Sequence, residues 1–198
     1  MTFQAALQTY KEFLDKNGYS TKNKLKIEST IESLKDWSEI MSLDQFKEWF
    51  MHQKENCLLT IKKKSLNKLQ GWEIDDKEGV IRHESGSFFS IIGLTISNSS
   101  SREIKSGWDQ PILMEKDEDG GIVGIIRKKI NGIPYYLIEA KAEPGNPDLV
   151  QISPALQATY SNLRQSHGGR KPYYADLFLN PKENNCEVLF DQFMSEDG

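Results

Sequence analysis

Apolar residues at helical spacing predict that residues 1–56 form a helical N-terminal segment. The first helix is predicted by an amphipathic series followed by Asn17-Gly18 as its end. The members of this series are Phe3, Ala6, Leu7, Tyr10, Phe13 and Leu14. Ser42 followed by Gln45 predicts a capping box at the start of another helix. Between them we expect a polar linker over 20–26 and a short helix over 31–37. This segment is expected to serve packing or dimerisation.

From Cys57 onward the pattern changes to short apolar runs separated by turn signals, which is typical of strands. The predicted strands cover residues 58–61, 80 onward, 88–96, 122–130 and 135–142. Asn131-Gly132 predicts a type I′ hairpin between the last two strands. Ser153-Pro154 predicts the start of a helix and Gly168-Gly169 its end. Helices, a mostly antiparallel sheet and a later helix indicate an α+β fold.

Composition limits the classes of function. The chain has 198 residues and a net charge of −4, which favours a globular protein and gives no general reason to expect nucleic-acid binding. The longest uncharged run, 85–101, is too polar for a membrane span, and no signal peptide is visible, so a cytoplasmic location is expected. Cys57 and Cys186 are far apart in the sequence and suggest neither a disulfide framework nor a zinc site.

Three ionisable residues, Arg82, His83 and Glu84, interrupt an apolar segment at residues 79–90. Strand alternation directs Arg82 and Glu84 to one face and His83 to the other, unless a bulge near Gly86 re-aims the strand. This pattern is compatible with three interpretations: a structural accident, a catalytic site and a ligand-binding site.

A second polar face is predicted on the strand over 135–142. Tyr135, Glu139, Lys141 and Glu143 fall on the same side of that strand. A solvent-facing surface with cross-strand ion pairs has the same pattern. Residues 143–147, Glu-Pro-Gly-Asn-Pro, form a rigid turn at the strand end, where polar groups including Asn146 can be held over a pocket.

Further candidates for ligand binding are spread over three segments. Trp108 and Gln110 lie in a predicted tight turn at 107–111, where the indole could stack on a flat ring or a sugar, although a Trp in a turn is more often part of the core. The predicted helix after Ser153 carries amides and hydroxyls that could bind a ligand, although an ordinary surface helix has the same pattern. The His167-Gly-Gly-Arg170 segment offers a cation beside flexible backbone, although a helix cap next to a surface Arg has the same sequence. The polar residues of that helix are Gln157, Thr159, Tyr160, Asn162 and Arg164.

Four blocks together resemble one family, the nucleoside-diphosphate-hexose 2,3-dehydratases. They are GWEIDDKEGVIRHESGSFFSIIGL (71–94), GWDQPIL (107–113), GIVGIIRKKINGIPYYLIEAKAEPGNPDLVQISPALQATYSNL (121–163) and HGGRKPYY (167–174). The resemblance extends from about Leu43 to the C-terminus. It implies a Nudix-like α+β module over 57–198. It also implies no metal and no cofactor, because no Arg-Glu-x-x-Glu-Glu run follows Gly145 and Gln157, Thr159 and Asn162 stand where metal-binding glutamates are expected.

The resemblance further implies loss of water across C2 and C3 of a dTDP-4-keto-6-deoxyhexose, on the way to 2,6-dideoxy sugars. This reaction needs a base at C3, donors for an enolate oxygen at C4 and an acid for the departing C2 hydroxyl. The candidates for these catalytic roles are His83, Glu84, Lys141 and Glu143. Glu143 or His83 is the expected base, and Lys141 is expected to stabilise the enolate. The expected substrate-binding residues are Arg82, Trp108, Gln110, Asn146, Gln157, Thr159, Asn162, His167 and Arg170.

Members of the resembled family usually carry two such modules in one chain, whereas this sequence carries one. The expected partner is a dTDP-sugar, and a homodimer is expected to rebuild the two-module body, with no nucleic acid or membrane as partner. A fragment or a stand-alone binder is the alternative state. The competing functions are a non-catalytic module that binds a nucleotide sugar and, third, a Nudix-type hydrolase.

Overall fold

The structure is a computed structural model that describes residues 1–86, 88–97, 107–114, 120–166 and 168–194. The chain divides into two compact units that alternate along the sequence. The first unit comprises Met1–Leu59, Val123–Gln157 and Tyr173–Gly198, and the second comprises Thr60–Ile122 and Ala158–Pro172. Each unit is described separately below.

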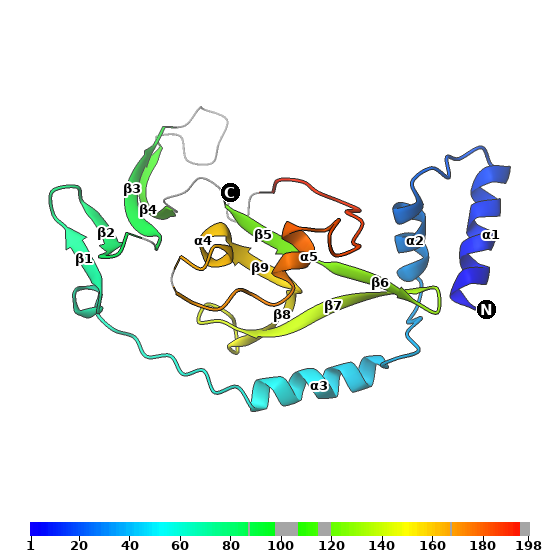
Figure 1. Cartoon of the computed structure of the whole chain (residues 1–198), viewed down its shortest axis with the longest axis horizontal. Coiled ribbons are helices and arrows are strands. Elements are labelled where there is room, and N and C mark those ends of the chain that lie inside the picture. The colour runs from blue at the N-terminus through cyan, green and yellow to red at the C-terminus, as the bar shows by residue number, and fades with distance from the viewer. Residues whose placement is uncertain (87, 98–106, 115–119, 167, 195–198) are drawn as a thin grey trace. The chain divides into compact units, whose positions relative to one another are not determined.

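Three helices open the first unit, α1 (Phe3–Lys16), α2 (Lys24–Glu32) and α3 (Leu43–Glu55) (Figure 1). The predicted helices at both ends of this segment are confirmed, and the Ser42 capping box is present with Gln45 as its partner. The predicted middle helix is wrong in position, because α2 begins inside the predicted linker. The Asn23 side chain accepts a hydrogen bond from the Lys26 amide and thereby caps α2 earlier than the apolar spacing suggested.

The same unit contains an antiparallel sheet of β6 (Ile126–Ile130), β7 (Ile133–Ala142) and β8 (Val150–Pro154). Asn131 and Gly132 join β6 to β7 with φ of 52° and 79°, both in the left-handed region that a type I′ turn requires. The predicted hairpin is therefore confirmed. A short helix, α5 (Ala175–Leu179), completes this unit.

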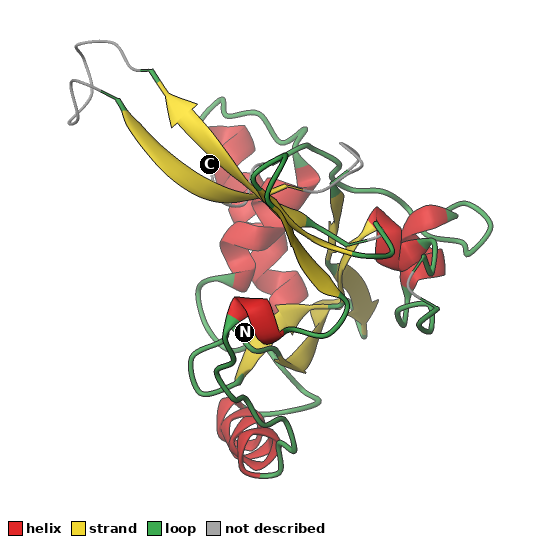
Figure 2. Cartoon of the chain, turned by 90° about the vertical axis from the view of Figure 1, so that its left-hand side faces the viewer, coloured by secondary structure: helices red, strands yellow, loops and turns green. Residues whose placement is uncertain are grey.

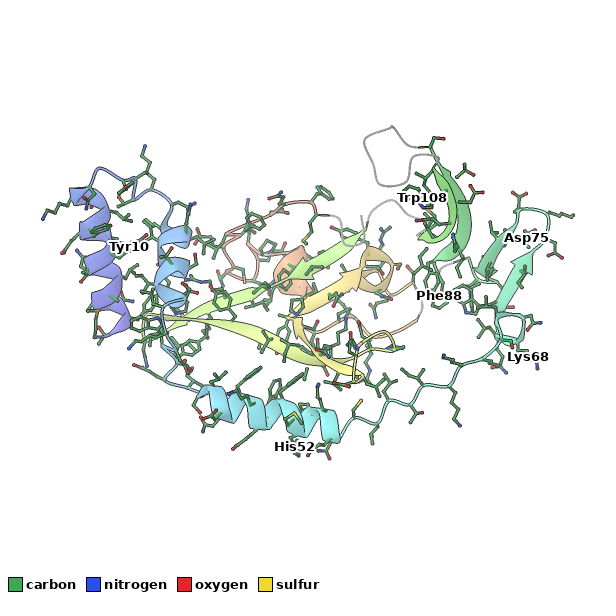
Figure 3. All side chains as sticks on the ribbon, turned by 180° about the vertical axis from the view of Figure 1, so that it is seen from behind. Tyr10, His52, Lys68, Asp75, Phe88 and Trp108 are labelled. Carbon is green, nitrogen blue, oxygen red and sulfur yellow. The ribbon has the colours of Figure 1, made fainter. Side chains whose placement is uncertain are left out.

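The hydrophobic core of the first unit joins the helical segment to the tip of the β6–β7 hairpin. Its buried members are Phe3, Ala6, Leu7, Ile27, Ile31 and Ile133. Tyr10 on α1 is partly buried against this cluster (Figure 3), as is Tyr135 of β7. The Tyr135 hydroxyl also accepts a hydrogen bond from the Glu39 amide at 2.8 Å. Helices α1 and α2 thus pack directly on the hairpin.

The second unit contains a four-stranded antiparallel sheet in the order β1-β2-β3-β4. Its strands are β1 (Trp72–Asp75), β2 (Val80–His83), β3 (Ser90–Ile96) and β4 (Trp108–Met114), preceded by a 3-10 turn at Leu66–Lys68. The single-turn helix α4 (Tyr160–Leu163) also belongs to this unit, whereas β5 (Gly121–Gly124) and β9 (Leu156–Thr159), which pair with each other, each have residues assigned to both units. The α+β class is confirmed, with antiparallel sheets and a helical N-terminal segment (Figure 2).

Three further local predictions are wrong. The long helix expected from Ser153 is replaced by β8, β9 and the short α4, because Val150-Gln-Ile-Ser alternates apolar and polar residues as a strand does and Thr159, not Ser153, caps the helical turn. Residues 58–61, all of them described, form no strand. The expected turn at 107–111 is instead the start of β4, whose register pairs Trp108 with Ile96.

Candidate functional site

Lys141 and Glu143 form the centre of the candidate site in the first unit. The Lys141 ammonium lies 2.7 Å from a Glu143 carboxylate oxygen, and the two side chains are 25% and 39% exposed. They share a face because they are two residues apart on β7 and its extension. The ammonium also donates to the Gln157 carbonyl at 3.3 Å. A carboxylate with a neighbouring cation, both partly open to solvent, provides a base and a group that stabilises negative charge.

The turn after β7 supports this pair. The Glu143 amide donates to the Leu149 carbonyl at 3.0 Å, and the Asn146 amide donates to the Glu143 carbonyl at 3.1 Å. The Asn146 side-chain nitrogen donates to the carbonyls of Lys141 and Leu149, at 3.2 and 3.3 Å. Lys54 of α3 reaches Asp148 in the same turn at 3.2 Å. Backbone, side chain and ion pair therefore all fix the segment that carries Glu143.

Two polar residues of β8 belong to this face and were not predicted. The register places Gln151 opposite Lys141 and Ser153 opposite Glu139. Ser153 is 6% exposed, and its hydroxyl donates to the Gln157 side-chain oxygen at 3.3 Å. The alternation of Val150-Gln-Ile-Ser could have identified both, had Ser153 not been interpreted as a helix cap. We call Lys141, Glu143, Gln151, Ser153 and Gln157 the Lys141–Glu143 site.

In the second unit His83 lies within a cluster of aromatic rings. The register of β1 and β2 pairs His83 with Trp72, and their ring centroids are 5.6 Å apart. Phe88, which lies just before β3 (Figure 3), is 4.5 Å from the imidazole. The ring of Phe89 packs on Trp72, with the two ring centroids 5.1 Å apart. His83 is thus half-buried among apolar rings that its sequence neighbours supply.

The two nitrogens of the His83 ring have different surroundings. The Ser85 amide donates to Nδ1 at 3.2 Å, and the Ser85 hydroxyl lies 2.8 Å from the same atom. A backbone N–H directed at Nδ1 favours a lone pair there, which places the proton of the neutral ring on Nε2. Nε2 in turn faces the Gly71 backbone, so closely that a Cβ at Gly71 would lie 2.5 Å from it.

The Arg82 guanidinium is held by two carboxylates. It contacts Glu73, its cross-strand neighbour, at 2.8 Å and Asp75 at 2.8 Å. The hydrogen bond to Glu73 and the charge of Asp75 raise the pKa of Arg82. Amides of Glu78 and Lys77 in the β1–β2 turn, with a smaller effect of Arg82, lower the pKa of Asp75. Asp75 is the last residue of β1 (Figure 3). Its ion pair with Arg82 of β2 therefore links the two strands next to the turn that joins them.

Glu84 and the two candidates of β4 also lie in the second unit. Glu84 is exposed in the turn after β2, and its amide donates to the Gly71 carbonyl at 2.8 Å. Trp108 donates from its indole nitrogen to the Gln110 side-chain oxygen at 2.5 Å. Gln110 lines an open depression of about 510 Å³ across β3 and β4, together with Gly93, Leu94, Thr95, Asp109 and Pro111.

The remaining predicted residues belong to β9, to α4 and to the segment that follows α4 in the sequence. Thr159 caps α4, and its hydroxyl accepts from the Asn162 amide at 3.4 Å. Asn162 and Arg170 are both exposed, and within the described residues Arg170 forms no ion pair. His167 lies outside the described residues. The described residues contain no group of three or more His, Cys, Asp or Glu side chains placed to hold a metal ion. Among the described helices, none has both the length and the apolar character needed to cross a membrane.

Comparison with known proteins places these residues in a family. The model of the NDP-hexose 2,3-dehydratase family matches residues 43–198. The chain belongs to this family. The match begins at the first residue of α3 and includes every strand and every candidate site residue, whereas α1 and α2 precede it.

Three curated relatives within this family carry the name dTDP-4-dehydro-6-deoxy-alpha-D-glucopyranose 2,3-dehydratase. The relative from Streptomyces violaceoruber is 37% identical over 155 residues, which cover 77% of this chain and 33% of the relative. The relative from Amycolatopsis orientalis is 31% identical, covering 80% of this chain and 33% of the relative. The relative from Saccharopolyspora spinosa is 37% identical, covering 67% and 26%. The chain thus spans about a third of the length of the first two relatives.

Proposed function

We propose that the protein is a sugar-nucleotide 2,3-dehydratase, a carbon–oxygen lyase that acts on a dTDP-4-keto-6-deoxyhexose. Membership of the 2,3-dehydratase family supports this reaction class, and the names of the relatives support the substrate. Within the structure of this chain, the main support is the Lys141–Glu143 pair. It combines a carboxylate with a cation 2.7 Å away on the polar face of a sheet.

In this proposal the Glu143 carboxylate removes the proton from C3 of the sugar. The C4 carbonyl acidifies this proton, and the electron pair of the C3–H bond moves towards the C4 oxygen as an enolate. The Lys141 ammonium stabilises that negative charge. The enolate then expels the C2 hydroxyl, which leaves as water with the proton taken from C3. The resulting enol rearranges to a 3,4-diketo-2,6-dideoxy sugar, and Glu143 ends the cycle as it began.

Glu143 fits the role of base better than His83. A base must present a free lone pair to the substrate. The Nδ1 lone pair of His83 already accepts the Ser85 amide, and its Nε2 faces the Gly71 backbone. Glu143 is 39% exposed and keeps an oxygen beyond the one that contacts Lys141.

The nucleotide and its phosphates are assigned to other residues. Arg170 is exposed and has the guanidinium geometry that suits phosphate, and Asn162 offers a side-chain amide in the same unit. Trp108 and Gln110, which contact each other on β4, offer a ring for stacking and an amide for hydrogen bonding. Arg82 is less suited to substrate binding than the resemblance implied, because Glu73 and Asp75 already contact its guanidinium.

The proposal includes a Nudix-like arrangement of the module and a homodimer as its working form. Family membership and the antiparallel sheets support the first. The second follows from the two-module organisation that members of the resembled family usually have, since two copies bring two modules together. Sedimentation of the purified chain measures the mass directly, and a monomer under conditions of full activity contradicts the dimer.

The test of the function is incubation of the purified chain with dTDP-4-keto-6-deoxyglucose, followed by mass spectrometry of the nucleotide sugar. Loss of one water from the substrate is the expected result. Binding of the substrate without that mass change would instead identify a non-catalytic nucleotide-sugar module. Release of a nucleoside monophosphate would identify a hydrolase.

A further inference from the structure

The turn that joins β7 to β8 has an unusual backbone for its sequence. Asp148 and Leu149 follow each other with φ of 55° and 64°, in the left-handed region that side chains with a Cβ rarely adopt. Strained backbone of this kind persists only where surrounding contacts hold it in place, and it occurs preferentially at functional sites. The strained pair lies directly before β8, in the turn that Glu143 begins.

One side chain closes this turn from inside. The Asn146 side-chain nitrogen donates to the carbonyl of Lys141 on β7 and to the carbonyl of Leu149 ahead of β8. An amide nitrogen has two N–H groups, so both of its donors are used by the backbone. Asn146 is half-buried, and its side chain therefore bridges the two ends of the turn.

We infer that Asn146 is a positioning residue for the Lys141–Glu143 pair and does not bind substrate through its amide nitrogen. Its two acceptors are the carbonyl of Lys141 itself and that of Leu149, which also receives the Glu143 amide. Loss of the bridge releases the backbone at both members of the ion pair together. This role rests on the proposed function for its catalytic consequence, but the geometry it predicts is measurable without turnover.

The informative variant is Asn146→Asp, which keeps the shape of the side chain but replaces the donors with oxygen atoms that face two carbonyls. The chain offers a matched control in Asn184, whose side-chain nitrogen donates to the carbonyls of Asp176 and Asn180 at 3.1 and 2.9 Å. Asn184→Asp removes the same two kinds of hydrogen bond in the same unit without touching Lys141 or Glu143.

The first measurement is the side-chain NH₃⁺ resonance of Lys141 in protein labelled with ¹⁵N-lysine, assigned by its loss in Lys141→Arg. We expect this resonance in the wild type and in Asn184→Asp, and its loss or exchange broadening in Asn146→Asp and in Glu143→Gln. An unchanged Lys141 resonance in folded Asn146→Asp overturns the inference. If that variant fails to fold, Asn146→Ser at the same site, which adds no charge, takes its place with the same expected outcome.

The second measurement separates positioning from substrate contact. In the dehydration assay we expect Asn146→Asp to lower kcat about tenfold or more while KM changes less than about twofold. A rise in KM at constant kcat would make Asn146 a binding residue and overturn the inference. Equal losses of kcat in Asn146→Asp and Asn184→Asp would reduce its role to general stability and also overturn it.

The two hypotheses fail in different ways. A wild-type chain that does not dehydrate the sugar contradicts the proposed function, and the Lys141 resonance still decides whether Asn146 holds the ion pair. A chain that dehydrates the sugar with an undisturbed Lys141 resonance in Asn146→Asp contradicts the inference and leaves the function standing.

Discussion

Arg127 of β6 donates to Glu28 of α2 across 2.7 Å, with the two side chains only 10% and 11% exposed. The same guanidinium contacts Glu32 at 2.7 Å, and Lys129 contacts Glu28 at 2.5 Å. The Tyr136 hydroxyl donates to Glu32 and accepts from the Arg127 side chain. This network lies between α2 and the β6–β7 hairpin, beside the apolar core that joins them.

Replacement of Arg127 by Met is expected to destabilise the protein by about 3 kcal/mol. The substitution leaves the mostly buried carboxylates of Glu28 and Glu32 without the guanidinium that pairs with both. Urea unfolding followed by circular dichroism measures the change. Lys47→Met is the control, since Lys47 pairs with Asp44 on the surface with side chains 60% and 88% exposed, and no measurable change is expected there. Equal stability of the two variants would contradict a structural role for the network.

The network also predicts a pH dependence of stability. Burial raises the pKa of Glu28, but hydrogen bonds from Lys129 and Arg127 outweigh burial and lower it below the ordinary value of 4.5. A carboxyl group with a depressed pKa in the folded state stabilises the protein above the unfolded pKa, and this contribution is lost as pH falls through the folded pKa. The stability difference between wild type and Glu28→Gln is therefore expected to be full near neutral pH and to shrink below pH 4.5. A difference that does not depend on pH would contradict this assignment.

Replacement of Glu143 by Gln is expected to lower the rate of dehydration about a hundredfold or more, since the amide cannot accept the C3 proton. Mass spectrometry of the nucleotide sugar over time measures the rate. Glu139→Gln is the matched control, because Glu139 lies on the same face of β7 and, among the described residues, forms no ion pair. The control is expected to keep its rate within about twofold.

The alternative base gives the opposite pattern. If His83 removed the proton, His83→Phe would abolish turnover and Glu143→Gln would leave it nearly intact. That outcome would reverse the assignment of the base.

Replacement of Gly71 by Ala is expected to displace the His83 ring. Gly71 has a φ of 75°, and its new Cβ would lie 2.5 Å from His83 Nε2. Gly18→Ala supplies the control, because Gly18 has a nearly equal φ of 74° and a Cβ added there would meet no atom within 4 Å, so it carries the backbone cost alone. The His83 imidazole resonances are expected to shift in Gly71→Ala and to stay in place in Gly18→Ala. Unshifted resonances in both variants would contradict the packing of His83 on Gly71.

The sequence predicted those features that local chemistry determines. The Ser42 capping box and the Asn131-Gly132 turn each depend on residues a few positions apart, and both are present. The polar face of β7 followed from alternation alone, and Lys141 does contact Glu143. Such features survive folding because no distant contact competes with them.

The sequence failed where tertiary pairing decides the outcome. Ser153-Pro154 has the form of a helix start, yet pairing with β7 holds it in β8, where Ser153 is opposite Glu139. Arg82 was expected to bind substrate, but the β1–β2 register places Glu73 beside it. The surroundings of His83 likewise depend on Trp72 across the sheet, which spacing along the chain does not reveal.

The network between α2 and the β6–β7 hairpin joins segments that are synthesised at different times. Glu28 and Arg127 are 99 positions apart, so α1 and α2 leave the ribosome long before the strand that neutralises and covers them is synthesised. Until then the apolar cluster of Phe3, Leu7 and Ile31 lacks Ile133 and Tyr135 of the hairpin, and incompletely covered apolar surface favours misassembly in nascent chains. The apolar core of the N-terminal segment can therefore be completed only once the hairpin is present.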